Sequence, residues 1–265
     1  MEVYAAMVDD MDRYIGEVFR ALRDLGEFDN TVVVFMSDNG AEGGDETRHP
    51  LFRKFVAECC DNSYDNLGRP GSFVFYGREW ARVSNVPNRF FKSTSAEGGI
   101  RTPAIISLPG GTEPRRHDGL LSVMDLAPTV LDLAGVERPG EVFDGRPVHA
   151  MQGRSFRSVL EGSEARLRGD AEALGFEQSN HRALIRGPWK IAQVQPPNGD
   201  GHWKLFNLDA DRSESTDLSQ ARPELFRELL DEWEAYAIAN GVVSLDEIRR
   251  QRPPVPGTRP APEGD

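Results

Sequence analysis

Apolar residues near the start of the chain recur every three or four positions and then become continuous. Residues 3–25 carry a single apolar stripe, which predicts an amphipathic helix. Its members are Val3, Met7, Met11, Ile15, Val18, Phe19 and Leu22. Gly26 and the pair Asp29-Asn30 predict the end of this helix and a turn. Residues 31–36 (TVVVFM) are apolar on both faces, which is typical of a parallel strand covered by helices on both sides.

A long polar stretch separates this strand from the next apolar segment. Residues 45–95 are polar and interrupted by Gly and Pro, so we expect an irregular loop. Residues 102–111 (TPAIISLPGG) predict a second short strand. A helix should follow, with Asp125 as its N-cap, Pro128 in its first turn and Gly135 at its end. This order of helix, strand, loop, strand and helix predicts an α/β layer with a mainly parallel sheet.

The pattern changes after about residue 165. Residues 182–194 and 202–209 flank the turn 196–201 (PPNGDG), which predicts an antiparallel hairpin. A helix is expected from Pro223 to Gly241. Its buried face should consist of Leu225, Phe226, Leu229, Leu230, Trp233 and Tyr236.

These patterns divide the chain into three parts. Residues 1–165 are interpreted as part of a larger α/β domain, and residues 166–245 as a small α+β subdomain. Residues 246–265 are rich in proline and are expected to form an extended tail.

The charge balance limits the partners that can be expected. The 265 residues include 43 acidic and 31 basic side chains, which give a formal net charge of −12. Nucleic acids and anionic membranes are recognised by basic surfaces, so neither is predicted as a partner. No apolar run is long enough to predict a transmembrane helix, and residues 1–4 do not resemble the start of a signal peptide. A cytoplasmic location is therefore expected, with the reservation that any export signal would lie upstream of this chain.

The two cysteines of the chain are adjacent, at Cys59 and Cys60. This arrangement excludes a disulfide framework that links distant elements, and it also excludes a zinc site built from two separated cysteine pairs. Both are interpreted as loop cysteines.

The first predicted strand ends at Asp38, Asn39 and Gly40, which cannot continue it. Ligands of open α/β sheets bind beyond the carboxyl ends of strands. Gly40 permits a tight turn or a positive φ, and carboxylate and amide oxygens suit Ca²⁺ or Mg²⁺. The same tripeptide is also common in simple turns, so both interpretations remain open on spacing alone.

Three segments taken together resemble the sulfatase family, and bacterial arylsulfatases in particular. They are VVVFMSDNGAEGG (32–44), YGREWARVSNVPNRFFKSTSAEGGIRTPAIISLPG (76–110) and SVMDLAPTVLDLAGV (122–136). The most specific element is Lys-x-x-x-x-Glu-Gly-Gly-x-Arg-x-Pro, from Lys92 to Pro103. Residues 187–219, which include GPWKI and WKLFNLDADRSESTDLS, are similar to the small C-terminal domain of that family.

The resemblance implies an alkaline-phosphatase-like fold, in which a mainly parallel sheet lies between helices and a small antiparallel sheet with a packed helix follows. It also implies that Asp38 and Asn39 bind a divalent cation, Ca²⁺ in the first place and Mg²⁺ as the alternative. Lys92 matches the lysine that holds a sulfate oxygen. Trp80 and Ser84-Asn85 are candidates for the wall of the pocket, with surface packing as the alternative for each.

The chain also departs from the family pattern. Ala96 stands where many relatives have a histidine before Glu-Gly-Gly, and Cys59 and Cys60 do not lie in the Cys-x-Pro-x-Arg signature of the nucleophile. The resemblance therefore covers the C-terminal portion of a sulfatase, with only part of the active site.

Three functions remain open from the sequence. The first is hydrolysis of small-molecule sulfate esters, with this chain inactive alone and dependent on a separate N-terminal half. The second is hydrolysis of phospho- or phosphonoesters by a member of the same superfamily. The third is non-enzymatic: a truncated relic, or a partner chain that folds only against a separate N-terminal half.

Overall fold

The computed structural model describes residues 1–44, 50–111, 114–244 and 247. They group into two compact units, one within residues 1–112 and 173–265 and the other within residues 113–172. The predicted division after residue 165 remains a prediction, and the predicted tail lies outside the described residues apart from Glu247. No helix in the described ranges is long and apolar enough to cross a membrane.

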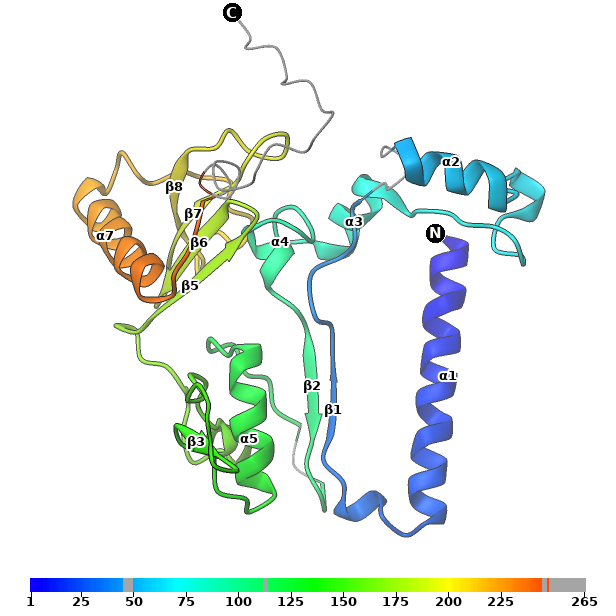
Figure 1. The fold of residues 1–265 in the computed structure, drawn as a ribbon, viewed down its shortest axis with the longest axis horizontal. Coiled ribbons are helices and arrows are strands. Elements are labelled where there is room, and N and C mark those ends of the chain that lie inside the picture. The colour runs from blue at the N-terminus through cyan, green and yellow to red at the C-terminus, as the bar shows by residue number, and fades with distance from the viewer. Residues whose placement is uncertain (45–49, 112–113, 245–246, 248–265) are drawn as a thin grey trace, which may run out of the picture. The chain divides into compact units, whose positions relative to one another are not determined.

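The first unit begins with the predicted amphipathic helix. Helix α1 (Glu2–Asp24) is followed by the 3₁₀ turn η1 (Phe28–Asn30) and strand β1 (Val33–Met36) (Figure 1). Helix and strand are thus confirmed, but their burial differs from the expectation. No residue of α1 is buried, and the side chains of Val34 and Phe35 in β1 are 38% and 42% exposed.

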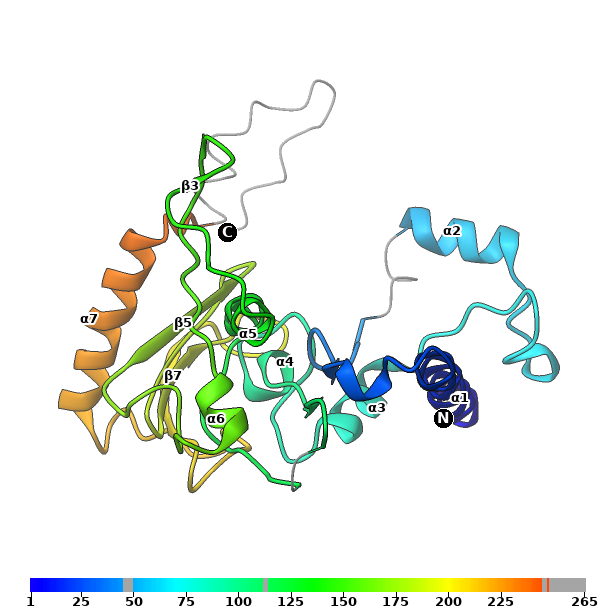
Figure 2. The same cartoon turned by 90° about the horizontal axis from the view of Figure 1, so that it is seen from below.

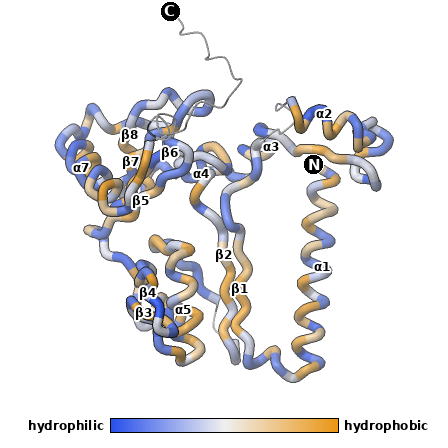
Figure 3. Tube along the Cα trace, viewed as in Figure 1, coloured by the Kyte–Doolittle hydropathy of each residue, from blue (hydrophilic) through white to orange (hydrophobic). Residues whose placement is uncertain are grey.

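Strand β1 pairs with strand β2 (Ala104–Ser107) in antiparallel orientation, with Val34 opposite Ile106 and Met36 opposite Ala104. Figure 3 shows that both strands are largely hydrophobic. The prediction of a parallel strand is wrong for this pair. The intervening chain returns to β2 at the end where β1 stops, and the Ser37 amide donates to the carbonyl of Pro103 there (3.4 Å). Every strand pair in the described residues is antiparallel, so the mainly parallel sheet is not confirmed.

Residues 50–100 include the described part of the loop predicted for residues 45–95, of which 45–49 lie outside the described residues, and they are not irregular. They contain helices α2 (Pro50–Cys59), α3 (Gly77–Asn85) and α4 (Glu97–Ile100), and the 3₁₀ turn η3 (Tyr64–Asn66). The missed signal for α2 was the helical spacing of Phe52, Phe55 and Val56. The ring of Phe52 also contacts those of Phe73 and Phe75, with centroids 5.7 and 6.1 Å apart.

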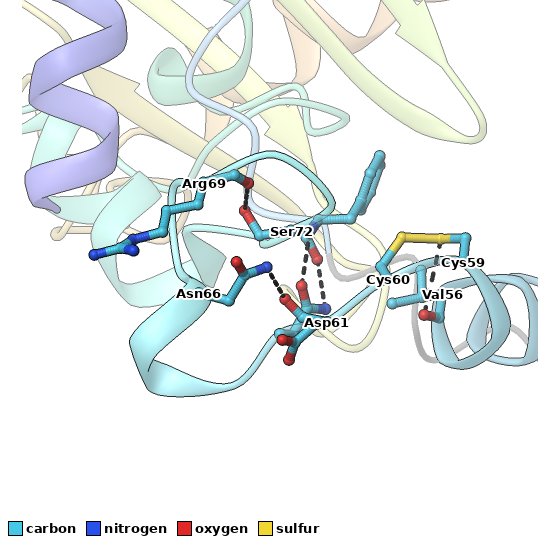
Figure 4. Close-up of a disulfide and its surroundings, with 9 residues drawn as sticks. Val56, Cys59, Cys60, Asp61, Asn66, Arg69 and Ser72 are labelled. Atoms are coloured by element: carbon cyan, nitrogen blue, oxygen red, sulfur yellow. Dashed lines mark hydrogen bonds between the residues drawn. A yellow bond between two sulfur atoms is a disulfide. The ribbon is translucent and has the colours of Figure 1, made fainter.

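Cys59 and Cys60 are joined to each other by a disulfide at the end of α2 (Figure 4). The bond links no distant elements, as expected. Cys59 is the last residue of α2, so only Cys60 lies outside a helix as predicted. The segment after the bond is held by hydrogen bonds. Asn62 and Phe73 exchange two of them, at 2.8 and 2.7 Å, which close the loop between these residues.

A four-stranded antiparallel sheet completes the first unit. Its strands lie in the order β5 (Ala173–Gln178), β6 (His181–Arg186), β7 (Trp189–Gln193) and β8 (Trp203–Asn207). The predicted hairpin is confirmed as β7–β8. The segment predicted as its first arm is itself a hairpin, β6–β7, because Gly187 and Pro188 turn the chain.

Helix α7 (Pro223–Ala239) packs on this sheet, as both Figures 1 and 2 show. Its Leu229 and Trp233 form the core with Leu184, Ile191 and Leu205 of the sheet. The predicted buried face of the helix is confirmed, since none of its six residues is exposed.

The second unit contains the 3₁₀ turn η4 (Val123–Asp125), helices α5 (Leu126–Leu133) and α6 (Arg157–Glu161), and the short strands β3 (Val142–Phe143) and β4 (Arg146–Pro147). Gly135 ends α5 with φ +68°, as predicted. Asp125 does not cap α5 with its side chain. Its carboxylate instead accepts from the Ser122 amide (2.8 Å) and pairs with the buried Arg168 guanidinium (2.5 Å), which fixes the entry to the helix.

Candidate active site

The Asp38-Asn39-Gly40 turn packs closely on the backbone of the Glu-Gly-Gly motif. The Gly40 amide donates to the carbonyl of Gly99 (3.2 Å). A Cβ on Gly40 would overlap the carbonyl of Gly98, so no other residue fits without a backbone shift. Gly40 is not among the glycines with positive φ. It is required here because two backbones approach closely, not because of its torsion angle.

Asn85, the last residue of α3, holds three segments of the site together. Its side-chain amide donates to the carbonyls of Phe90 and Gly98, both at 2.9 Å. Its side-chain oxygen accepts from the Ala41 amide (3.2 Å). The sequence suggested Asn85 as part of the pocket wall. The structure shows that its side chain is hydrogen-bonded to both the turn after β1 and the Glu-Gly-Gly motif.

The two glycines of that motif are needed for the same reason as Gly40. A Cβ on Gly98 would overlap the carbonyls of Arg89 and Phe90, and one on Gly99 would overlap that of Thr94. The segment from Thr94 to Gly99 is buried throughout. The motif is therefore a tightly packed core element that carries Lys92 at its edge.

Lys92 lies beside the turn that carries Asp38 and Asn39. Its backbone amide donates to the carbonyl of Ala41 (3.0 Å), and its ammonium pairs with the carboxylate of Glu42 at 2.8 Å. Partial burial opposes ionisation of Glu42, but hydrogen bonds from Lys92 and from the Gly44 amide outweigh it and hold the pKa of Glu42 below its ordinary value. The sequence gave no reason to single out Glu42, although it directly follows the Asp-Asn-Gly-Ala segment.

Asp38 and Asn39 follow the strand end as predicted. The side chain of Asp38 is exposed and that of Asn39 is half-buried. Carboxylate and amide oxygens are hard donors that suit Ca²⁺ or Mg²⁺, so the donor chemistry fits the cation that the family implies. Two donors are a small part of a calcium shell of about 6–8 oxygens. Within the described ranges, no three His, Cys, Asp or Glu side chains are grouped as a metal site.

A buried ionic triad supports the motif from the C-terminal sheet. The ammonium of Lys190 in β7 lies 2.9 Å from carboxylate oxygens of both Glu97 and Glu214. These side chains are 0%, 2% and 1% exposed. Glu214 also accepts from the Glu97 backbone amide (2.9 Å), and Arg101 lies 3.5 Å from Glu97. Glu97 begins α4, so the triad fixes the motif to the sheet.

The charges of the triad stabilise one another against burial. Desolvation raises the pKa of Glu97, but the attraction of Lys190 and then of Arg101 outweighs it, and the pKa of Glu97 falls below its ordinary value. Desolvation likewise opposes the charge on Lys190, yet the carboxylates of Glu214 and Glu97 raise its pKa. Both shifts favour the charged forms of Glu97 and Lys190 at neutral pH.

Comparison with known proteins identifies the family. Residues 1–136 match the family model described as Sulfatase, and residues 88–234 match the model described as N-sulphoglucosamine sulphohydrolase, C-terminal. The chain belongs to the sulfatase family. The resemblance inferred from the motifs is thereby confirmed, with this chain corresponding mainly to the C-terminal part.

Several relatives show the extent of the match. An uncharacterised sulfatase of Schizosaccharomyces pombe is 39% identical over 249 residues, which cover 93% of this chain and 45% of the relative. An arylsulfatase of Klebsiella aerogenes is 42% identical over 60% of this chain and 34% of its own length. The crystal structure of Ps i-CgsB in complex with k-i-k-neocarrahexaose superposes with a TM-score of 0.61 at 25% identity, over 88% of this chain and 42% of that one. The chain thus spans less than half the length of these relatives.

Proposed function

We propose that this polypeptide is the C-terminal part of an arylsulfatase-type enzyme that hydrolyses sulfate esters. The observation that carries the proposal is the locked arrangement of the Asp-Asn-Gly turn, Lys92 and the Glu-Gly-Gly motif in a chain of the sulfatase family. In this proposal the side-chain oxygens of Asp38 and Asn39 hold a divalent cation, Ca²⁺ or alternatively Mg²⁺. The cation would supply positive charge that polarises the ester.

Lys92 is assigned to the sulfate group in this proposal. Its ammonium would donate to a sulfate oxygen and stabilise the negative charge that grows there in the transition state. Asn85 and the glycines of the motif are assigned a supporting role, from their internal hydrogen bonds and close backbone contacts. They hold the two segments in register, so that Lys92 stays beside the strand end that carries Asp38 and Asn39.

The exposed apolar surface of the first unit supports a further part of the proposal. On α1, Met7, Met11 and Val18 are 67%, 45% and 58% exposed, and on β2 Ile105 is 67% exposed. Apolar side chains exposed along one face of a helix are typical of a surface that packs on another element. Since the relatives are more than twice as long, we infer that an N-terminal half of the sulfatase domain covers these residues and completes the active site.

The proposal is tested in two steps. In the first, binding of Ca²⁺ and Mg²⁺ to the purified chain is measured by titration calorimetry. Asp38→Ala should weaken the binding at least ten-fold, whereas the control Asp65→Ala, an exposed acidic residue in η3, should not change it. Equal binding by wild type and Asp38→Ala would refute the metal assignment.

In the second step, hydrolysis of a chromogenic aryl sulfate is compared with that of the matching aryl phosphate and phosphonate ester. The isolated chain should be inactive, because two metal donors and one lysine provide no nucleophile. Turnover of the sulfate ester should appear when the N-terminal half of a relative is added. Preference for the phosphate or phosphonate ester would favour the other superfamily activity, and no turnover of any ester in the mixture would favour a non-catalytic relic.

A further inference from the structure

Glu42 lies against Lys92 at a position to which the proposed function gives no role. Oε2 of Glu42 is 2.8 Å from Nζ of Lys92, and the two side chains are 53% and 38% exposed respectively. Ion pairs of this exposure contribute little to stability. A structural contribution is therefore a weak explanation for the pair.

The pair is held more firmly than most surface ion pairs. The Lys92 amide donates to the carbonyl of Ala41, which fixes the two backbones side by side (3.0 Å). The second carboxylate oxygen of Glu42 accepts from the Gly44 amide (2.6 Å). Gly43 packs on the ring of Phe91, where a Cβ would overlap the ring. Both carboxylate oxygens of Glu42 are therefore engaged, one by Lys92 and the other by the Gly44 amide.

We propose that Glu42 is a positioning residue for Lys92 and competes with sulfate for its ammonium. This inference rests on the sulfate-binding role of Lys92 in the proposed function. The carboxylate has the same sign of charge as sulfate and occupies one of the three N–H donors of the ammonium. Bound sulfate must share Lys92 with Glu42, so the affinity for free sulfate is lowered while the lysine side chain stays ordered.

A lowered affinity for free sulfate has a use in ester hydrolysis. Inorganic sulfate is the product of that reaction, and tight binding of it would block the site. Binding that is equally strong in ground state and transition state does not accelerate the chemical step. A carboxylate beside Lys92 weakens the complex with the product sulfate and so favours its release.

The chain offers a direct measurement, because it has four lysines, Lys54, Lys92, Lys190 and Lys204. The 265-residue chain, labelled with ¹³C at the lysine ε-carbon, is titrated with sodium sulfate against sodium chloride of equal ionic strength. The NMR signal of Lys92 is identified by its loss in Lys92→Met. Tryptophan fluorescence and circular dichroism confirm that each variant is folded.

In Glu42→Gln, the Lys92 signal should respond at a sulfate concentration about 2- to 5-fold lower than in wild type, the factor that corresponds to a pair of this exposure. Glu58→Gln is the matched control, because Glu58 pairs with Lys54 at 3.7 Å on the exposed side of α2. It should leave the Lys92 response unchanged.

The outcomes separate this inference from the proposed function. If sulfate shifts the Lys92 signal equally in wild type and Glu42→Gln, the competition by Glu42 is refuted and the role of Lys92 stands. If sulfate shifts that signal in neither protein, both the inference and the sulfate role of Lys92 are refuted.

Discussion

Replacing Lys190 by methionine would leave the carboxylates of Glu97 and Glu214 buried without the cation that they share. Methionine preserves most of the aliphatic length of lysine, so the change removes the charge with little loss of packing. The two carboxylates are 2% and 1% exposed, and water cannot replace the lost ammonium. Arg101 remains 3.5 Å from Glu97 and compensates it only in part.

The expected loss can be worked out in two ways. Removal of one partner from a buried ion pair typically destabilises a protein by about 3–5 kcal/mol. Alternatively, a carboxyl group that loses its counter-ion in such a site takes up a proton, and burial can raise its pKa by about 3 units. At about 1.4 kcal/mol per unit, this gives about 4 kcal/mol at neutral pH. Domains are commonly stable by only about 5–15 kcal/mol, so the variant should be close to unfolding.

The assay is urea denaturation followed by tryptophan fluorescence. Trp203 and Trp233 belong to the core between the C-terminal sheet and α7, with ring centroids 5.1 Å apart, and report the unfolding of this sheet. Lys204→Met is the matched control, because Lys204 lies on the neighbouring strand and pairs with the exposed Asp200 at 2.7 Å. Its loss should cost less than about 1 kcal/mol.

A rescue variant keeps the prediction testable if Lys190→Met does not fold. In Lys190→Met/Glu97→Gln/Glu214→Gln the whole triad is neutral, so no carboxylate is left buried without its cation, which is the strongly destabilising situation. This triple variant should be more stable than Lys190→Met. If Lys190→Met is as stable as Lys204→Met, or if the triple variant is less stable than the single one, the triad does not stabilise the fold by its charge.

Three further predictions follow from the same geometry. Because the pKa of Glu97 is lowered and that of Lys190 is raised, the stability that their pairing contributes is present above the unfolded carboxyl pKa of about 4.3 and below the unfolded lysine pKa of about 10.4. The stability advantage of wild type over the neutral triple variant should therefore be larger at pH 7 than at pH 3.5 by urea denaturation, and equal differences would contradict the assignment. Gly40→Ala should lower the free energy of unfolding by about 1–3 kcal/mol, because the added Cβ overlaps the backbone, and it should also weaken Ca²⁺ binding. Gly16→Ala is the control, because a Cβ at this position of α1 meets no neighbour, and it should not destabilise the protein. Equal melting temperatures of the two variants would refute the close-packing argument. Asn85→Ala removes three hydrogen bonds and should cost about 2–4 kcal/mol in the same denaturation assay; a loss below about 0.5 kcal/mol would show that Asn85 does not bracket the site.

The elements with a clear local pattern were predictable from the sequence. Helices α1 and α7, strand β2 and the β7–β8 hairpin follow from periodicity and turn residues, which act over a few positions. The orientation of β1 relative to β2 was not predictable from the sequence, because an apolar run has the same pattern in a parallel and in an antiparallel pair. Orientation is decided by the path of the chain between them, and that path depends on hydrogen bonds such as those of Asn85.

The candidate site was predictable in its residues but not in its supports. Asp38, Asn39 and Lys92 stand out through their motifs, and their joint role remains a prediction. Lys190 gave no signal, because a lysine in a strand normally points to solvent. It is buried here because β7 is an inner strand whose other face meets the Glu-Gly-Gly motif, 93 residues away in the sequence. The burial of Lys190 is explained only by an ion-pair partner that is distant in the sequence.

Helix α1 shows the opposite case: its sequence pattern predicts a buried face, but the described residues do not bury that face. Its apolar stripe is among the clearest in the sequence, yet none of its residues is buried. An isolated helix gains nothing from a continuous apolar face, and exposed methionines and valines favour aggregation. The stripe is explained if a further surface packs on it, and strand β1, which pairs only with β2 in the described residues, has an edge for the same purpose. The features that the buried triad stabilises, namely the Glu-Gly-Gly motif and Lys92, would then form one wall of a site whose other wall packs on α1 and β1.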